Sequence, residues 1–179
     1  AVFPLLIYFF TKIPIAKNLK LSAGYLVVAL IFIGILRVVL GKTIGTGNTS
    51  ILDNVLVSAD NFMEQKATAF LILGRYLKLL FFPHPLVSDA VHAQIPLTSF
   101  GDWKALLSVL IHVGLGGWAL LNVKKKSVFA FGILFYILTL SITSNLVFNI
   151  GTSYAERLLY VPVLGFAIAI AYGLMRIFR

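Results

Sequence analysis

Four long apolar runs constrain the fold of this chain more than any other feature of its sequence. They cover residues 21–40, 103–122, 127–150 and 158–178, and a shorter run covers residues 1–10. A helix needs about 20 apolar residues to cross the hydrocarbon core of a bilayer. The chain is also 60% hydrophobic and only 12% charged, whereas soluble domains are roughly half apolar and a quarter charged. The sequence therefore predicts an all-α fold, a polytopic transmembrane helix bundle with about five spans, in a single transmembrane domain over residues 1–179.

The basic residues gather in clusters at the ends of these runs. The clusters are Lys12, Lys17 and Lys20; Lys124, Lys125 and Lys126; and Arg176 and Arg179. Lys and Arg are enriched in cytoplasmic loops of membrane proteins. All three clusters fall on the cytoplasmic side if a further apolar stretch, residues 67–82, does not cross the membrane, and every acidic residue then falls on the opposite side. We expect residues 67–82 to form an interfacial or re-entrant amphipathic helix on the outer, periplasmic or lumenal, side.

Two cations lie within this predicted interfacial helix. Arg75 and Lys78 are three residues apart, so they share one helical face. Both side chains could extend their charged heads to water or lipid headgroups while their stems lie in the interface. The alternative is an anion site facing a cavity.

A charge pair stands between the last two apolar runs. Glu156 and Arg157 are adjacent and are flanked by Tyr154 and Tyr160. An exposed ion pair contributes only about 0–1 kcal/mol of stability, which is a weak reason to place one there. A guanidinium binds phosphate through two hydrogen bonds, and a carboxylate beside it can fix its orientation. The sequence thus predicts an outward-facing interfacial site for an anionic headgroup.

Polar residues inside the apolar runs have less specific interpretations. Ser141, Ser144, Asn145 and Asn149 follow helical spacing, which indicates either a hydrated cavity that opens outward or hydrogen bonds between helices. His112 lies in the middle of its run, where ionisable residues usually face the bundle interior. We expect a neutral imidazole that is hydrogen-bonded to a neighbouring helix.

The sequence gives little indication of a metal site, of cysteine chemistry or of nucleic-acid binding. His84, Asp89 and His92 match no established metal-ligand spacing, so we assign no metal site. No cofactor is indicated, and a requirement for a divalent metal stays open. The chain has no cysteine, which excludes disulfides and thiol catalysis. Its net charge of +9 is scattered between apolar runs rather than gathered on one face, so we expect no nucleic-acid partner.

Several motifs resemble a known family when taken in order. They are DNVLVSA at 53–59, GRYLKLLFFPHPLVSD at 74–89, QIPL at 94–97 and SNLVFNIGTSYAERLLYVPVLGF at 144–166. In this order and separation they are similar to the membrane region of the tetratricopeptide-repeat O-mannosyltransferase family and its bacterial relatives. These are multi-pass glycosyltransferases of the GT-C architecture.

The resemblance implies an activity and an identity for the anion. The donor would be a polyprenyl-phosphate-linked sugar, the acceptor a Ser or Thr hydroxyl of a protein, and transfer would occur on the periplasmic or lumenal side. Candidates for holding the donor phosphate are Arg157 with Glu156, and Arg75 with Lys78. Candidates for the cavity rim are His84, Asp89, Tyr154 and Asn149.

The family pattern also implies that parts of the enzyme lie outside this chain. The catalytic acidic residue is expected in an outer loop N-terminal to these residues, and the repeats are expected after the membrane region, so no catalytic residue is assigned here. The protein is expected to be a multi-pass integral membrane protein that contacts membrane lipid. We favour the bacterial inner membrane over the endoplasmic reticulum membrane.

Three other functions remain open on the sequence alone. A flippase or transporter of lipid-linked sugars could also use intramembrane Arg and His, although charged residues lining a path through the core would be expected. A polysaccharide polymerase or ligase would use the same lipid phosphates. A noncatalytic membrane assembly subunit would need no catalytic residue.

Overall fold

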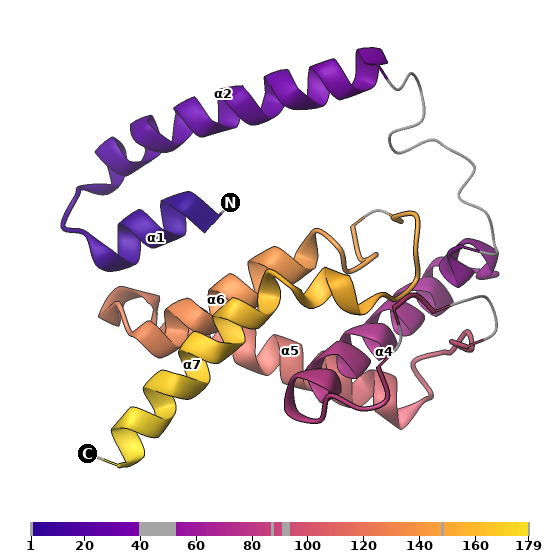
Figure 1. Cartoon of the computed structure of the whole chain (residues 1–179). Helices are drawn as coiled ribbons and strands as arrows, with labels where there is room; N and C mark the ends of the chain where they lie inside the picture. Colours follow the sequence, from indigo (N-terminus) through magenta and orange to yellow (C-terminus); the bar gives the residue numbers. More distant parts are fainter. Residues whose placement is uncertain (1, 40–52, 87, 91–93, 148, 179) are drawn as a thin grey trace. The chain divides into compact units, whose positions relative to one another are not determined.

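The computed structural model describes residues 2–39, 53–86, 88–90, 94–147 and 149–178, and these residues form helices joined by turns and loops, with no strand among them (Figure 1). The elements in chain order are α1 (Val2–Phe10), α2 (Ile15–Val39), η1 (Val55–Ser58), α4 (Phe62–Phe81), α5 (Trp103–Leu121), η2 (Val123–Lys125), α6 (Val128–Ser141), η3 (Glu156–Leu159) and α7 (Pro162–Ile177). The all-α class is therefore confirmed. The chain divides into two compact units, Ala1–Asn48 and Thr49–Arg179.

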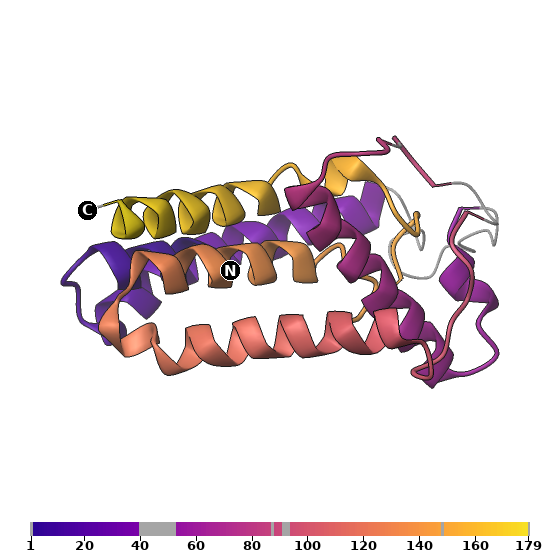
Figure 2. The same cartoon turned by 90° about the horizontal axis from the view of Figure 1, so that it is seen from below.

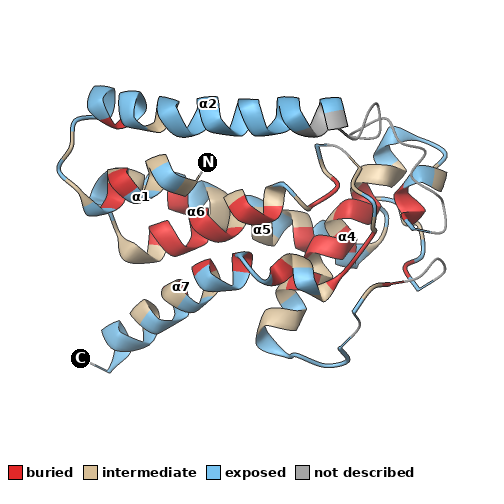
Figure 3. Ribbon diagram, turned by 45° about the horizontal axis from the view of Figure 1, so that its top comes forward, coloured by how far each residue is buried: buried red, intermediate tan, exposed pale blue. Residues whose placement is uncertain are grey.

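The first unit is a pair of helices, α1 and α2, joined by a short turn. The Asn18 side chain donates a hydrogen bond to the Pro4 carbonyl at 3.0 Å, and the rings of Phe3 and Tyr25 lie 4.0 Å apart. Most of the apolar side chains of α2 are exposed (Figure 3). An apolar helix whose side chains are mostly uncovered by its own unit is typical of a segment that meets lipid or another protein surface.

Helix α4 provides the core of the second unit. It begins after Asn61, whose side chain accepts a hydrogen bond from the Glu64 amide at 2.9 Å and so satisfies a backbone donor of the first turn. One face of α4 is buried, with Ile72 and Tyr76 fully enclosed. The helix thus covers the predicted segment 67–82 except for its last residue, and it begins earlier, at Phe62. One face packs on protein, as expected for an amphipathic helix.

Helices α5, α6 and α7 run side by side (Figure 2). At the crossing of α6 and α7, a Cβ added to Gly132 would lie 2.6 Å from the Gly165 carbonyl oxygen, and a Cβ added to Gly165 would lie 2.6 Å from the Gly132 carbonyl oxygen. Two glycines therefore allow the backbones to meet. Helix α5 contacts α6 through the rings of Trp118 and Phe129, 5.3 Å apart.

The span predictions are confirmed only in part. Among the described helices, two are long and apolar enough to cross a membrane, over Ile15–Ile35 and Trp103–Leu121, whereas the sequence predicts about five spans. The apolar helices Val128–Ser141 and Pro162–Ile177 are shorter, and α1 has 9 residues.

The largest correction concerns the predicted run 127–150. Helix α6 ends at Ser141, and the chain then turns rather than continuing as a helix. The Ser141 and Ser144 hydroxyls donate to the carbonyls of Leu138 and Ser141 at 2.8 and 2.9 Å, which competes with helical hydrogen bonding. Asn145 then adopts a left-handed backbone with φ 56°, a conformation that commonly terminates helices. The predicted helical stripe through Asn149 therefore does not form.

Candidate functional site

A buried amide network joins the first motif to the last. The Asn54 side-chain NH₂ donates to the Asn145 side-chain oxygen at 3.0 Å and to the Ile150 carbonyl at 2.8 Å. The Ser153 hydroxyl in turn accepts from the Val55 amide at 2.7 Å. Asn54 and Asn145 are almost completely buried. Because buried polar groups must be satisfied to avoid a large desolvation cost, this network defines the path of the loop that follows α6.

Tyr76 ties the same loop to α4. Its phenol oxygen accepts a hydrogen bond from the Ala155 amide at 3.0 Å and donates to the Ala155 carbonyl at 3.2 Å. Its ring stacks on that of Tyr154, with centroids 4.7 Å apart. Burial raises the pKa of the Tyr76 phenol above its ordinary value, because the charged phenolate would be poorly solvated there. Tyr76 is therefore a neutral donor and acceptor that holds residues 154 and 155 against α4.

Arg157 forms an ion pair with Asp89, which lies 68 residues earlier in the sequence. The Asp89 carboxylate also accepts a hydrogen bond from the Thr152 hydroxyl at 3.3 Å, and the Ala90 amide donates to the Tyr154 carbonyl at 2.9 Å. The sequence assigned the orientation of Arg157 to Glu156 and placed Asp89 at a cavity rim. The structure brings Asp89 to the guanidinium. The Arg157 side chain remains 64% exposed.

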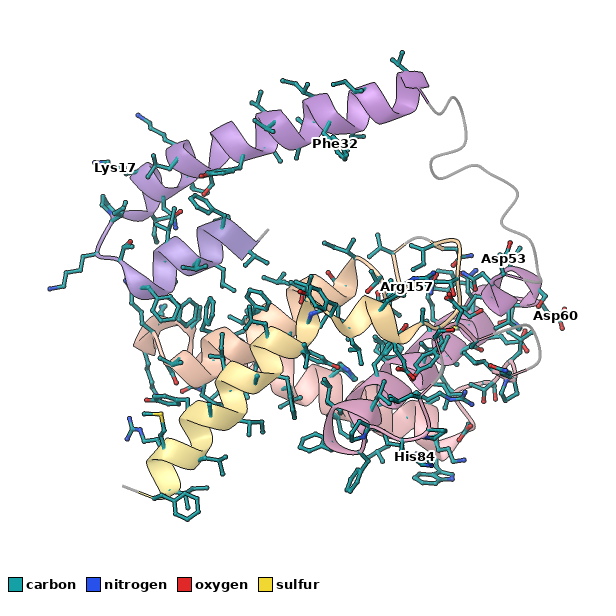
Figure 4. The ribbon with its side chains drawn as sticks, in the orientation of Figure 1. Lys17, Phe32, Asp53, Asp60, His84 and Arg157 are labelled. Carbon is teal, nitrogen blue, oxygen red and sulfur yellow. The ribbon has the colours of Figure 1, made fainter. Side chains whose placement is uncertain are left out.

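A cavity of about 300 Å³ collects half of the predicted site residues. It is lined by Arg75, Lys78, Leu79, Phe82, His84, Pro85 and Tyr154. Arg75 and Lys78 meet there because they lie one helical turn apart on α4. His84 follows the end of α4, and Arg157 lies on the segment that leads into α7 (Figure 4).

The Arg75 guanidinium donates a hydrogen bond from Nη1 to the Gln94 carbonyl at 3.3 Å, which links it to the QIPL motif. This is its one hydrogen bond within the described residues, and a guanidinium has five N–H donors, so others can serve a ligand. Burial raises the pKa of the neighbouring Tyr154 phenol, and the Glu156 charge adds to this rise. The cavity thus combines two cations with a phenol that stays protonated near neutral pH.

The other predicted site residues lie outside this cavity. Among the described residues, its lining does not include Arg157, Glu156, Asp89 or Asn149. Asn149 is half-buried in the loop after α6. The cavity nevertheless adjoins the Asp89–Arg157 ion pair. Tyr154 lines the cavity, and its carbonyl accepts a hydrogen bond from the amide of Ala90, the residue after Asp89.

Sequence reasoning did not anticipate the residues that assemble this site. Tyr76 and Ser153 were not singled out, and Asn54 was noted only as part of a motif. Their hydrogen-bond partners lie 79 to 99 residues away in the chain. A local sequence pattern cannot predict a contact between residues so far apart. Two of the motifs did point to one contact of the site. Arg75 lies in the motif at 74–89 and Gln94 in the motif at 94–97, and the two residues are hydrogen-bonded.

The remaining polar predictions have separate outcomes. His112 lies on α5, where its Nδ1 is 2.8 Å from the Ser108 carbonyl and its Nε2 is 3.4 Å from the Tyr136 hydroxyl, so the expected hydrogen bond to a neighbouring helix is confirmed. His92 lies outside the described residues. In the part of the chain that the structure describes, no group of three or more His, Cys, Asp or Glu residues is arranged to hold a metal ion.

Comparison with known proteins points in the same direction as the motifs. No protein-family model and no solved structure matches the chain. It is 29% identical over 140 residues to protein O-mannosyl-transferase TMTC4 of Mus musculus, covering 74% of this chain. It is also 29% identical over 137 residues to protein O-mannosyl-transferase Tmtc3 of Drosophila melanogaster, covering 71% of this chain. This chain is similar to protein O-mannosyl-transferases.

The similarity concerns one region of these longer proteins. The matched residues cover 19% of the mouse protein and 14% of the fly protein. The chain therefore spans less than a fifth of the length of these relatives.

Proposed function

We propose that this chain is part of an integral membrane glycosyltransferase that transfers a sugar from a polyprenyl-phosphate donor to Ser or Thr hydroxyls of proteins. The similarity to two protein O-mannosyl-transferases supports the reaction class and suggests a mannose-like sugar. The observation that carries the proposal is the joint placement of Arg75 and Lys78 in one cavity with His84 and Tyr154. Two cations in a partly enclosed space suit a phosphate ligand.

The reaction assigns distinct tasks to these groups. The acceptor hydroxyl oxygen bonds to the anomeric carbon, the bond from that carbon to the phosphate oxygen breaks, and a carboxylate takes the hydroxyl proton. Negative charge grows on the leaving phosphate, and cations placed beside it stabilise that charge. Arg75 and Lys78 have this role in our proposal. Arg157, held by Asp89 and largely exposed, is a further cation that the phosphate could engage in exchange for Asp89.

The membrane arrangement is part of the proposal. Helix α5 separates Asp102 at its N-terminal end from the lysines that follow its C-terminal end. The positive-inside tendency then puts the lysines on the cytoplasmic side and the Arg75–Lys78 cavity on the periplasmic or lumenal side. A multi-pass bundle, in the bacterial inner membrane or the endoplasmic reticulum membrane, would provide this separation.

A charge-matched pair of variants on one helix tests the role of the cavity. The measurement is transfer of radiolabelled sugar from polyprenyl-phosphate donors to protein in proteoliposomes, comparing Lys78→Gln with Lys66→Gln. Both lysines lie on α4, but Lys66 packs over the Phe62 ring and does not line the cavity in the described residues. Loss of one charged contact should lower transfer by Lys78→Gln about 10- to 100-fold, and Lys66→Gln should retain wild-type transfer.

Two results would contradict the proposal. Equal transfer by both variants would remove the cavity from the donor site. Absence of transfer in the wild type, together with movement of the labelled lipid to the opposite leaflet, would favour a flippase instead.

A further inference from the structure

A second and larger cavity lies between α4 and α5. Its volume is about 450 Å³, within the range of small-molecule pockets. Its walls are mainly apolar and include Leu71 and Leu77 of α4 with Leu107 and Ile111 of α5. Gly74 also lines it and faces Ser108, where an added Cβ would lie 3.1 Å from the Ser108 Cβ. The missing side chain brings the two helices together at this level and leaves an apolar groove beside their contact.

Charged groups lie along one part of this groove. Arg75, Lys78 and Lys104 line it together with Asp102. The Asp102 carboxylate already caps α5, accepting from the Lys104 amide at 2.8 Å and from the Thr98 hydroxyl at 3.3 Å. Three cations against one engaged carboxylate leave a positive excess, so the groove matches an apolar molecule that ends in an anionic group.

Arg75 and Lys78 line both cavities. The larger cavity is mostly aliphatic, whereas the smaller one presents His84 and Tyr154. A ligand whose phosphate lies at these two cations could therefore extend an apolar chain in one direction and a polar group in the other. A polyprenyl-phosphate-linked sugar has this order of parts.

We propose that the groove between α4 and α5 binds the first isoprene units of the donor lipid, with the phosphate at Arg75 and Lys78 and the sugar toward His84 and Tyr154. This inference rests on the proposed function and adds a subsite to it. In this proposal the groove takes a single linear chain, whereas a diacyl phospholipid would bring a second chain.

Binding of a lipid that lacks the sugar tests the subsite without requiring any transfer. The probe is a long-chain isoprenoid monophosphate, bound to the protein in nanodiscs and quantified by displacement of a fluorescent isoprenoid phosphate. Leu107→Trp places bulk in the groove. Leu106→Trp is the matched control, because Leu106 and Leu107 are 45% and 46% exposed and, among the described residues, Leu107 lines the groove and Leu106 does not.

We expect Leu107→Trp to weaken binding of the long-chain probe by roughly tenfold or more, because apolar contacts of the chain are lost. Leu106→Trp should bind like the wild type. Geranyl phosphate, which has two isoprene units, should bind more weakly than the long-chain probe to the wild type.

Several outcomes would overturn the subsite. Equal affinity of the two tryptophan variants for the long-chain probe would do so. Phosphatidic acid binding as tightly as the isoprenoid phosphate, with the same loss in Leu107→Trp, would make the groove a general phospholipid site and contradict the chain specificity. The two proposals can also fail separately. If Leu107→Trp weakens isoprenoid binding but the wild type transfers no sugar, the subsite stands and the glycosyltransferase function is rejected.

Discussion

Single side chains decide how the loop between α6 and α7 reaches the site. Tyr76 provides both hydrogen bonds to Ala155, and Asn54 and Asn145 provide the amide contacts that precede it. These groups are enclosed, so each unpaired partner would cost about 1–3 kcal/mol. The loop that contains Tyr154 and Arg157 is therefore held by specific polar contacts rather than by apolar packing alone.

Tyr76→Phe should lower the free energy of unfolding by about 1–3 kcal/mol, because the buried Ala155 amide and carbonyl lose their partner. The raised pKa of Tyr76 also predicts a dependence on pH. Below the ordinary phenol pKa of about 10, the stabilising contribution is fully present. As pH rises above that value, the unfolded chain ionises first and stability falls.

The measurement is thermal unfolding of the purified protein in detergent between pH 8 and 11. Tyr172→Phe is the control, because the Tyr172 hydroxyl hydrogen-bonds to Arg176 in an exposed position and its ring, which the substitution keeps, lies against the same guanidinium. Tyr76→Phe should lose less stability than the wild type on going to high pH. A loss as steep as that of the wild type would show that Tyr76 does not titrate with unfolding.

At the scale of the elements, the crossing of α6 and α7 depends on glycine. Gly132 and Gly165 face each other with no room for a Cβ, and α7 begins at Pro162, a residue suited to the first turn of a helix. The short helix η3, which contains Arg157, directly precedes α7.

Gly132→Ala should destabilise the protein by about 1–3 kcal/mol, because the new methyl group meets backbone atoms that cannot rotate away. Gly117→Ala on α5 is the matched control, since nothing lies within 4 Å of a Cβ there. Alanine favours a helix over glycine by about 0.5–1 kcal/mol, so the control should be neutral or stabilising. Equal unfolding midpoints for both variants would contradict the close crossing.

At the scale of the whole molecule, the distribution of charge predicts a topology. The chain has no cysteine, so a single introduced thiol reports its own location. Ser99→Cys and Lys125→Cys lie at exposed positions near the two ends of α5. If α5 crosses the membrane, an impermeant maleimide added to right-side-out vesicles should label Ser99→Cys and should reach Lys125→Cys only after permeabilisation. Labelling of both before permeabilisation would show that α5 does not cross.

Local patterns were sufficient for several features of this protein. The apolar runs predicted helices, and each of the four long runs contains one, because backbone groups in apolar surroundings must bond within the segment. The three-residue spacing of Arg75 and Lys78 predicted a shared face, and both side chains line the same cavity. The hydrogen bond from the His112 imidazole to a neighbouring helix followed from its place within an apolar run.

Tertiary structure decided the rest. Composition and local spacing were enough to predict the helical class and the cation pair on α4, and the motifs alone showed the resemblance to O-mannosyltransferases. The sequence could not show that α6 stops at Ser141, because an apolar run continues past that residue and the turn depends on Asn145 meeting Asn54, 91 residues away. Nor could it pair Asp89 with Arg157. Periodicity reports which residues share a face of one element, whereas the meeting of distant loops depends on how the elements pack.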